Sequence, residues 1–263
     1  MRRLIVCADD FGQGPQVDEG ILALARAGRL TAVSCLARGP AFRPDLPALL
    51  ATGADPGLHL DLTEGFDGAP RARLVGLVLR SHLGWVDREA VRRHLRDQLE
   101  AFEAAAGRPP VFVDGHQHVH QLPVVRGLLL AELRRRYPTR PPLVRVTVPR
   151  RARGAKAALL AALGGRALRR ALQAQGLPHN PDFAGVYDFD PRAPYRALVQ
   201  GWLGSLADGG LLMCHPGRPS HDAISAARVA ELAYLGSDAF EADCAAAGVT
   251  LVPPRALLAP AGG

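Results

Sequence analysis

The sequence is poor in several kinds of residue, and each shortage excludes a class of protein. Aromatic residues make up only 5% of the 263 residues, too few for the stacking platforms that bind single-stranded nucleic acid, so we expect no nucleic-acid partner. The four cysteines form no C-x-x-C pair and most lie in apolar stretches, which is typical of reduced core residues. No apolar run reaches the roughly 18 residues that a membrane-spanning helix needs. The amino terminus leads directly into a strand, without the pattern of a signal peptide, and we expect the protein to be cytoplasmic.

Lysine is almost missing as well. Lys156 is the only lysine, so arginine supplies nearly all of the 32 basic side chains, which exceed the 25 acidic ones and leave a formal net charge of +7. A solvated basic surface is the simplest interpretation of this excess. The arginine-rich stretch 145–170 also carries an apolar helical face, and it predicts either an ordinary surface helix or a peripheral contact with an anionic membrane.

The rest of the composition is that of an ordinary globular protein, with 48% hydrophobic and 22% charged residues. The length suits one large α/β domain, and we expect a single domain over residues 1–263. Apolar runs of strand length alternate along it with segments of helical periodicity. Strands are expected at 4–8, 32–36, 57–62, 111–113, 143–148, 211–214 and 249–252, and helices at 17–26, 88–106, 124–136, 155–173 and 223–246.

This alternation predicts βα units, and therefore an α/β fold with mainly parallel strands in a closed barrel or an open sheet. Three segments rich in Gly, Pro and Asp predict longer loops, at 40–47, 65–73 and 178–190. Loops of this kind often lie over an active site.

Polar residues gather at the ends of four of these strands, in the motifs ADDFG (8–12), GLHLDLTEG (57–65), VDGHQHVH (113–120) and MCHPG (213–217). All four motifs fall at carboxyl ends, which meet on one face of a parallel α/β fold. Residues more than 200 positions apart in the sequence can therefore share one pocket.

Histidines are concentrated in these motifs, which hold five of the nine in the chain. Imidazole and carboxylate groups together suit a divalent ion such as zinc. Any one of these histidines alone, such as His59, is more often a hydrogen-bonded core residue, but their convergence favours metal ligands. Of the three in VDGHQHVH, His116 is nearest the strand end and is the preferred ligand. A metal also explains the adjacent Asp9 and Asp10, because ligation by one carboxylate leaves the other ionised beside it.

The ordered motifs ADDFG, GLHLDLT, DGHQHVH and MCHPG resemble those of the YdjC-like carbohydrate deacetylase family, which includes chitooligosaccharide deacetylases and a branch associated with hopanoid biosynthesis. The similarity extends from Ala8 to Gly217. It implies a distorted (β/α) barrel with mainly parallel strands, related to the polysaccharide deacetylases. It also implies a metal-dependent enzyme that removes the acetyl group from an N-acetylated amino sugar, in an oligosaccharide or a lipid-linked glycoside. A homodimer would fit the family.

The resemblance implies a role for each motif. One divalent metal ion, magnesium or zinc, would be held by three side chains: Asp10, His59 and His116. Asp9 would be the catalytic base, His215 the general acid, and Arg145 would orient Asp9. The polysaccharide deacetylases place two metal-binding histidines as H-x-x-x-H on one helical face, and the resemblance does not extend to such a helical pair. The ligands are therefore expected from separate strand ends, and the identity of the metal stays open.

Beyond the reacting groups, four residues are expected to bind the substrate: His118, Asp182, Phe183 and Tyr187. Ordinary loop packing is the alternative for the last three. Two further functions stay open, because the same ligand set can hydrolyse a phosphate or other ester, and a non-catalytic protein can bind a sugar at such a metal. The presence of both Asp9 and His215 disfavours the second, since binding alone needs no acid and base.

Overall fold

The structure, a computed structural model, describes residues 1–66 and 72–258. Its centre is an eight-stranded sheet in which the paired strands run parallel. The strand order is β5-β4-β3-β2-β1-β7-β6, and β8 pairs with the start of β1. The strands are β1 (Arg2–Phe11), β2 (Ala32–Cys35), β3 (Asp55–Leu60), β4 (Phe112–Gly115), β5 (Leu143–Val144), β6 (Phe183–Ala184), β7 (Gly210–Cys214) and β8 (Val249–Leu251).

The sheet curls into a distorted barrel, and its last gap is closed largely by one side chain. Between the edge strands β5 and β6, the backbone makes a single parallel bridge from Val144 to His179. Asn180 then takes the place of a strand: its amide accepts a hydrogen bond from Val146 N at 2.7 Å and donates to Val146 O and Asp182 O, each at 2.9 Å. The distorted (β/α) barrel with parallel strands is thereby confirmed.

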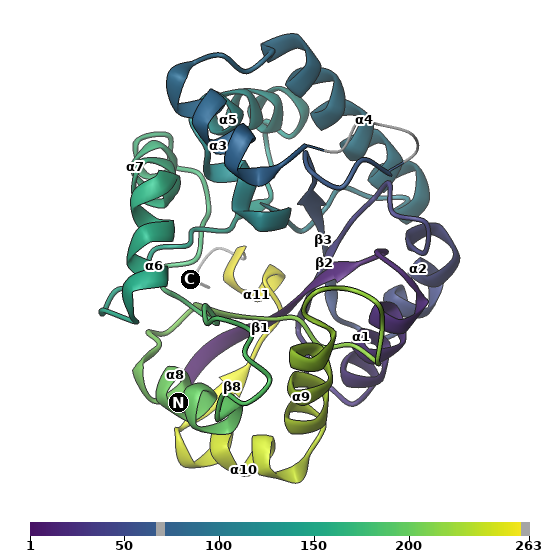
Figure 1. The fold of residues 1–263 in the computed structure, drawn as a ribbon, viewed down its shortest axis with the longest axis vertical. Coiled ribbons are helices and arrows are strands. Elements are labelled where there is room, and N and C mark those ends of the chain that lie inside the picture. Colours follow the sequence, from purple (N-terminus) through teal and green to yellow (C-terminus); the bar gives the residue numbers. More distant parts are fainter. Residues whose placement is uncertain (67–71, 259–263) are drawn as a thin grey trace.

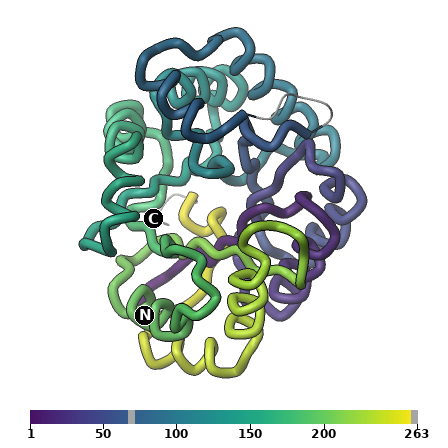
Figure 2. The backbone as a smooth tube through the Cα atoms, viewed as in Figure 1, coloured from purple at the N-terminus to yellow at the C-terminus, as the bar shows by residue number. Residues whose placement is uncertain are grey.

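Helices surround the strands, as the ribbon and the backbone tube both show (Figures 1 and 2). They are α1 (Pro15–Arg26), α2 (Phe42–Leu50), α3 (Leu74–Leu83), α4 (Arg88–Ala106), α5 (Val125–Arg136), α6 (Ala155–Leu160), α7 (Arg166–Ala174), α8 (Tyr195–Ser205), α9 (Ser225–Leu235), α10 (Asp238–Ala246) and α11 (Arg255–Leu258). A 3₁₀ segment, His116–Gln121, follows β4, and a π-helical segment, Ala161–Gly165, joins α6 to α7.

Strand β1 shows how the fold positions polar residues. Successive side chains of a strand point to opposite faces, and Leu4 and Val6 belong to the larger core cluster, whereas Ile5 and Cys7 belong to a second cluster inside the barrel. Continuing the alternation carries Asp9 into the barrel interior. A strand that enters the barrel with apolar residues therefore ends with a carboxylate in its centre.

The expected elements are mostly present, and the differences have local causes. The segment 155–173 contains the π-helical segment between α6 and α7, and 223–246 is two helices, because Gly236 ends α9 before α10 begins. Most of the expected loop 40–47 lies in α2, and the loop 178–190 contains β6. Of the expected loop 65–73, residues 67–71 lie outside the described part of the chain.

Among the described residues, no helix combines the length and the apolarity needed to cross a membrane. Two arginines of the stretch 145–170 are not surface groups: Arg145 is fully buried, and Arg153 forms an ion pair with Asp182 at 2.7 Å. The basic face that the sequence indicated is therefore smaller than the count of arginines implies.

Candidate active site

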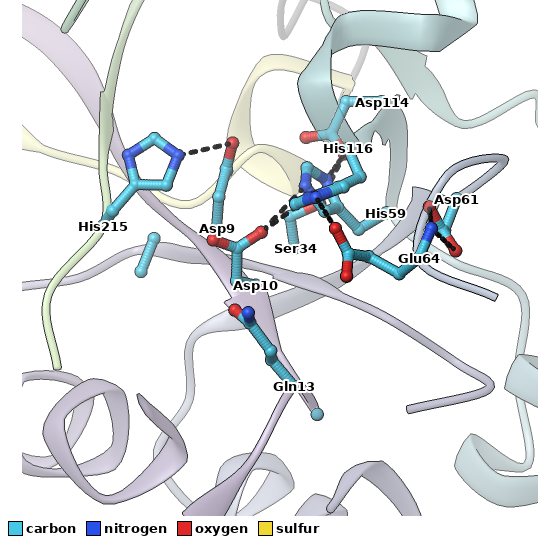
Figure 3. Close-up of polar contacts among 12 residues, drawn as sticks. Asp9, Asp10, Gln13, Ser34, His59, Asp61, Glu64, Asp114, His116 and His215 are labelled. Carbon is cyan, nitrogen blue, oxygen red and sulfur yellow. Dashed lines mark hydrogen bonds and ion pairs between the residues drawn. The ribbon is translucent and has the colours of Figure 1, made fainter. Parts of the chain in front are cut away.

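The four sequence motifs meet at the carboxyl ends of β1, β3, β4 and β7, around a cavity of about 650 Å³. The cavity is lined by the carboxylates and imidazoles of Asp9, Asp10, His59, His116 and His215. Figure 3 shows these side chains converging on one centre from separate strands. Parallel strand ends meet at one face, which is why the motifs converge as expected.

Three of these side chains form a candidate metal centre. Ligand atoms of Asp10, His59 and His116 all lie within 4.8 Å of one another. Asp10 Oδ1 is 3.4 Å from His59 Nε2 and 2.9 Å from His116 Nδ1 (Figure 3). Asp10 has a φ of 74°, a left-handed conformation that Asp tolerates better than most residues and that is frequent at functional sites.

The second nitrogen of His59 is held by carboxylate and hydroxyl groups. His59 Nδ1 lies 2.6 Å from Asp114 Oδ1 and 2.9 Å from Ser34 Oγ, and Ser34 Oγ also donates to Asp114 Oδ1. A carboxylate behind a histidine is the usual support of a metal ligand, because it fixes the ring and leaves Nε2 free to bind. This arrangement fits a metal at the Asp10 side of His59.

The charges around this centre also fit a bound cation. Burial lowers the pKa of His59, but Asp114, Asp9 and Asp10 outweigh it and raise that pKa to about 9. Burial acts the same way on His116, and Asp10 raises its pKa to about 10. Glu64 adds a further carboxylate, with Oε1 at 3.3 Å from His116 Nε2. The centre therefore favours positive charge, which a divalent ion supplies.

Asp9 lies in a different environment from its neighbour Asp10. Arg145 Nη1 and Nη2 each donate to one oxygen of Asp9 at 2.6 Å, and Nη2 is also 2.6 Å from Asp114 Oδ2. Burial raises the pKa of Asp9, but Arg145 and His59 outweigh it and hold that pKa below its usual range. Asp9 is thus an ionised carboxylate in the barrel interior, as its expected pairing with Arg145 requires.

His215 lies on the far side of Asp9 from His59, with Nε2 at 3.9 Å from Asp9 Oδ2 (Figure 3). The Phe189 ring packs edge-on against it, with ring centroids 5.1 Å apart. Burial lowers the pKa of His215 to about 4, despite the nearby Asp9 and Asp10. Burial thus favours the uncharged imidazole over the imidazolium that a pre-charged general acid would be.

Comparison with known proteins gives the same motifs a family context. The model of the YdjC-like protein family matches residues 3–246. The chain belongs to this family. A human protein named carbohydrate deacetylase is 32% identical to this YdjC-like protein over 291 residues, covering 95% of the chain and 89% of that protein. A chitooligosaccharide deacetylase of Escherichia fergusonii is 34% identical over 137 residues, covering 47% of the chain and 52% of that protein.

Solved structures share the fold of this YdjC-like protein. A crystal structure of a protein from Enterococcus faecalis V583 has a TM-score of 0.75 at 20% identity, and the match covers 97% of this chain and 98% of that protein's chain. A peptidoglycan N-acetylglucosamine deacetylase has a TM-score of 0.51 at 12% identity, covering 97% and 87%. At these identities the likeness concerns the fold alone, and it confirms the relation to the polysaccharide deacetylase architecture.

The structure separates the four residues expected to bind substrate. His118 and Tyr187 line the cavity. Asp182 does not, because its carboxylate is buried and holds Arg153 and the backbone N–H groups of Arg150 and Ala207. Phe183 is buried behind His118, with ring centroids 6.1 Å apart. The expectation that Asp182 and Phe183 bind the substrate is therefore not met by the lining of this cavity, which contains only His118 and Tyr187 of the four.

Sequence reasoning missed several residues of the site. Asp114 and Glu64 stand inside the quoted motifs, so their position at strand ends was the signal that could have identified them. Arg228 and Glu231 gave no such signal, because they lie in an amphipathic helix where charged residues usually face solvent. Their burial in α9 is visible only in the folded molecule.

Proposed function

We propose that this YdjC-like protein is a metal-dependent hydrolase that removes the N-acetyl group from an amino sugar, in an oligosaccharide or a lipid-linked glycoside. The observation that carries the proposal is the meeting of Asp10, His59 and His116 within 4.8 Å, beside the ionised Asp9 and the imidazole of His215. Relatives named carbohydrate deacetylase and chitooligosaccharide deacetylase support the same reaction.

Asp10, His59 and His116 would hold the metal ion. Two imidazoles and one carboxylate suit zinc at least as well as magnesium, which prefers oxygen ligands. When bound, a divalent ion supplies Lewis-acid polarisation of the amide carbonyl and lowers the pKa of a nearby water. The acid–base chemistry then depends on the protein's own side chains.

Asp9 would accept the proton of the attacking water. Arg145 donates to both oxygens of this carboxylate and keeps it ionised. The buried carboxylate would therefore be available as a base. The products of the hydrolysis are acetate and a free amine. An amide anion is a very poor leaving group, so the departing nitrogen must be protonated as the C–N bond breaks.

His215 would deliver that proton. Because its imidazole is uncharged before the reaction, it must first gain the proton, and Asp9 Oδ2 lies 3.9 Å from His215 Nε2. The proton that Asp9 takes from water would therefore pass to His215 and from there to the leaving amine. One proton would thus be transferred three times, from water to Asp9, to His215 and to the amine, and the two side chains would return to their initial states.

The cavity walls support a substrate with an apolar part. Tyr187 and Phe189 bring aromatic rings to the lining, and the lining also contains the aliphatic side chains of Leu159, Leu163 and Ile224. Aliphatic side chains offer little to a purely hydrophilic oligosaccharide, because they form no hydrogen bonds with hydroxyl groups. This lining favours a lipid-linked glycoside over a free oligosaccharide.

A panel of substrates tests the proposal, with acetate measured for the N-acetyl sugars and p-nitrophenol measured for the two p-nitrophenyl compounds. Purified protein with added Zn²⁺ or Mg²⁺ is incubated with diacetylchitobiose, an alkyl N-acetylglucosaminide, p-nitrophenyl phosphate and p-nitrophenyl acetate. We expect acetate from the N-acetyl sugars, more rapidly from the alkyl glycoside, and loss of this activity in His59→Ala. Turnover of only the phosphate or the ester would replace the proposal with the corresponding hydrolase. Sugar binding without any turnover would indicate a non-catalytic binding protein.

A further inference from the structure

Helix α9 brings two buried charged side chains to the site, and the roles described so far use neither. Arg228 is 2% exposed and Glu231 is 0% exposed. They are three residues apart, so they lie on one face of the helix. Burying a charge is costly unless it is paired and hydrogen-bonded. What each side chain contacts therefore indicates why the helix carries it.

Arg228 is bonded to the candidate metal ligand Asp10. Its Nη2 donates to Asp10 Oδ2 at 2.6 Å and to Gln13 Oε1 at 3.0 Å, and its Nε donates to Asp222 Oδ2 at 2.7 Å. Because Arg228 occupies Oδ2, the other oxygen, Oδ1, is the one that faces His59 and His116. The guanidinium thus determines which oxygen of Asp10 is presented to the candidate metal centre.

Glu231 is bonded to the backbone of His215. Its Oε2 accepts from His215 N at 2.6 Å and from Tyr195 Oη at 3.3 Å, while its Oε1 accepts from Tyr187 Oη at 2.7 Å. Arg228 Nη1 adds a longer bond to His215 O, at 3.4 Å. Both backbone polar groups of His215 are therefore held by α9.

We propose that α9 is the positioning element of this active site. Arg228 presents one oxygen of Asp10 to the metal, and Glu231 sets the place of the His215 imidazole relative to Asp9. Both are positioning residues, because they act through Asp10 and His215. The inference rests on the proposed deacetylase function and adds to it how one helix holds the groups at the carboxyl ends of the neighbouring strands β1 and β7.

The positioning role of Arg228 is tested with Co²⁺ as a spectroscopic probe of the metal centre. In Arg228→Met and Arg228→Lys we expect the d–d absorption bands of bound Co²⁺ to shift, because the freed Oδ2 of Asp10 can also reach the ion. We expect kcat to fall about 10- to 100-fold. The spectrum is more informative than the affinity, since loss of the guanidinium in Arg228→Met also removes a positive charge that opposes cation binding. The lysine variant retains that charge.

A matched control for Arg228 is Arg196→Met. Arg196 pairs with Asp243 on the surface, at 2.9 Å, and its loss should leave both the Co²⁺ spectrum and kcat unchanged. Thermal melting of the metal-free variants separates a positioning effect from general unfolding.

The part of Glu231 is tested by Glu231→Gln, with Glu231→Asp as a second variant should the first fold poorly. We expect kcat to fall about 10-fold while KM changes less than about twofold, with an unaltered Co²⁺ spectrum, because Glu231 acts on His215 and not on the metal ligands. Glu241→Gln, which breaks a surface ion pair with Arg29, is the control.

The outcomes separate this inference from the function on which it rests. Wild-type protein that neither binds Co²⁺ nor releases acetate overturns both. Active wild-type protein, together with Arg228 variants of unchanged spectrum or folded Glu231 variants of unchanged kcat, overturns the positioning role alone.

Discussion

Two adjacent aspartates take up different environments because successive side chains at the end of β1 point in different directions. Asp9 continues the inward alternation of β1 and meets Arg145, whereas Asp10 turns at the rim to meet His59, His116 and Arg228. Both carboxylates have a lowered pKa, in Asp9 through Arg145 and in Asp10 through Arg228 and His116, in each case against the effect of burial. Neighbours in sequence are thus given separate partners by the fold.

We expect this separation to appear as two mutant phenotypes. Asp9→Asn should retain Zn²⁺ binding but lose about 10²- to 10⁴-fold in kcat, because the base is gone while the ligands remain. Asp10→Ala should lose Zn²⁺ binding. Metal content after gel filtration and acetate release measure the two effects. Full turnover in Asp9→Asn would remove that residue from its assigned role.

The buried carboxyl group of Asp18 should make the stability of the protein depend on pH. It is buried in α1 and accepts a hydrogen bond from Gly12 N at 2.7 Å. Burial, with Asp45 nearby, raises its pKa to about 8, against about 3.9 in an unfolded chain. The folded state therefore binds the extra proton between these values, so this contribution to stability is complete below about pH 4 and is lost progressively as the pH rises to about 8.

Asp18→Asn should remove that slope. As the pH rises from 5 to 7, the free energy of unfolding of the variant should increase relative to that of wild type by on the order of 1 kcal/mol per pH unit. Urea unfolding at several pH values measures it, with the exposed Asp238→Asn as control. A constant difference between variant and wild type across this range would contradict the assignment.

At the scale of elements, helix α1 packs so closely on the loop after β7 that only glycine fits. A Cβ on Gly20 would lie 2.7 Å from Gly217 Cα, in the MCHPG motif. This contact packs α1, the helix that follows β1 and Asp9, directly against the loop that follows β7 and His215. A periodic pattern predicts that α1 exists, but not which face of it touches which loop.

Gly20→Ala should therefore destabilise the protein and lower kcat, because backbone must move away from the new methyl group. Gly201→Ala in α8 is the matched control: nothing lies within 4 Å of its added Cβ, and alanine there should stabilise the fold by about 0.5–1 kcal/mol. Chemical denaturation and acetate release compare the two. Equal stabilisation by both changes would show that the loop at Gly217 moves away from the new methyl group without loss of stability.

The elements recovered from the sequence were those with their own local signals. The expected helix 88–106 coincides with α4, whose N-cap Asp87 accepts from Glu89 N at 2.9 Å and Ala90 N at 3.0 Å and whose end is a left-handed Gly107. Strand β6 has two residues and exists only because β7 pairs with it. Such an element has no periodicity to read, so it was placed in a loop.

At the scale of the whole molecule, closure of the barrel depends on Asn180 more than on strand pairing. Two of its three hydrogen bonds, both with the backbone of Val146, join the chain after β5 to the chain before β6, and the third goes to Asp182 O. Arg145, the partner of Asp9, directly precedes Val146, to which Asn180 is bonded. Closure of the barrel and the position of Asp9 are thus linked. The single domain over 1–263, the homodimer, the membrane contact and the cytoplasmic location stay predictions.

Asn180→Ala should destabilise the protein by roughly 3 kcal/mol or more, since each buried backbone group left without a partner costs about 1–3 kcal/mol. Gln200→Ala, which removes a surface hydrogen bond to Asp243, should change stability by less than about 0.5 kcal/mol. Urea denaturation of the two variants tests this. Similar small effects in both would mean that water or backbone movement replaces the Asn180 amide.

The sequence by itself determined the composition of the site: parallel βα units send polar strand ends to one face, so ADDFG, GLHLDLTEG, VDGHQHVH and MCHPG were expected together. Only the tertiary structure decided which charged groups stand behind them. Arg228, Glu231 and Asn180 are ordinary polar residues in helix or loop, and their roles come from burial. Burial and pairing depend on how helices pack against the barrel, and chain-local patterns do not contain that information.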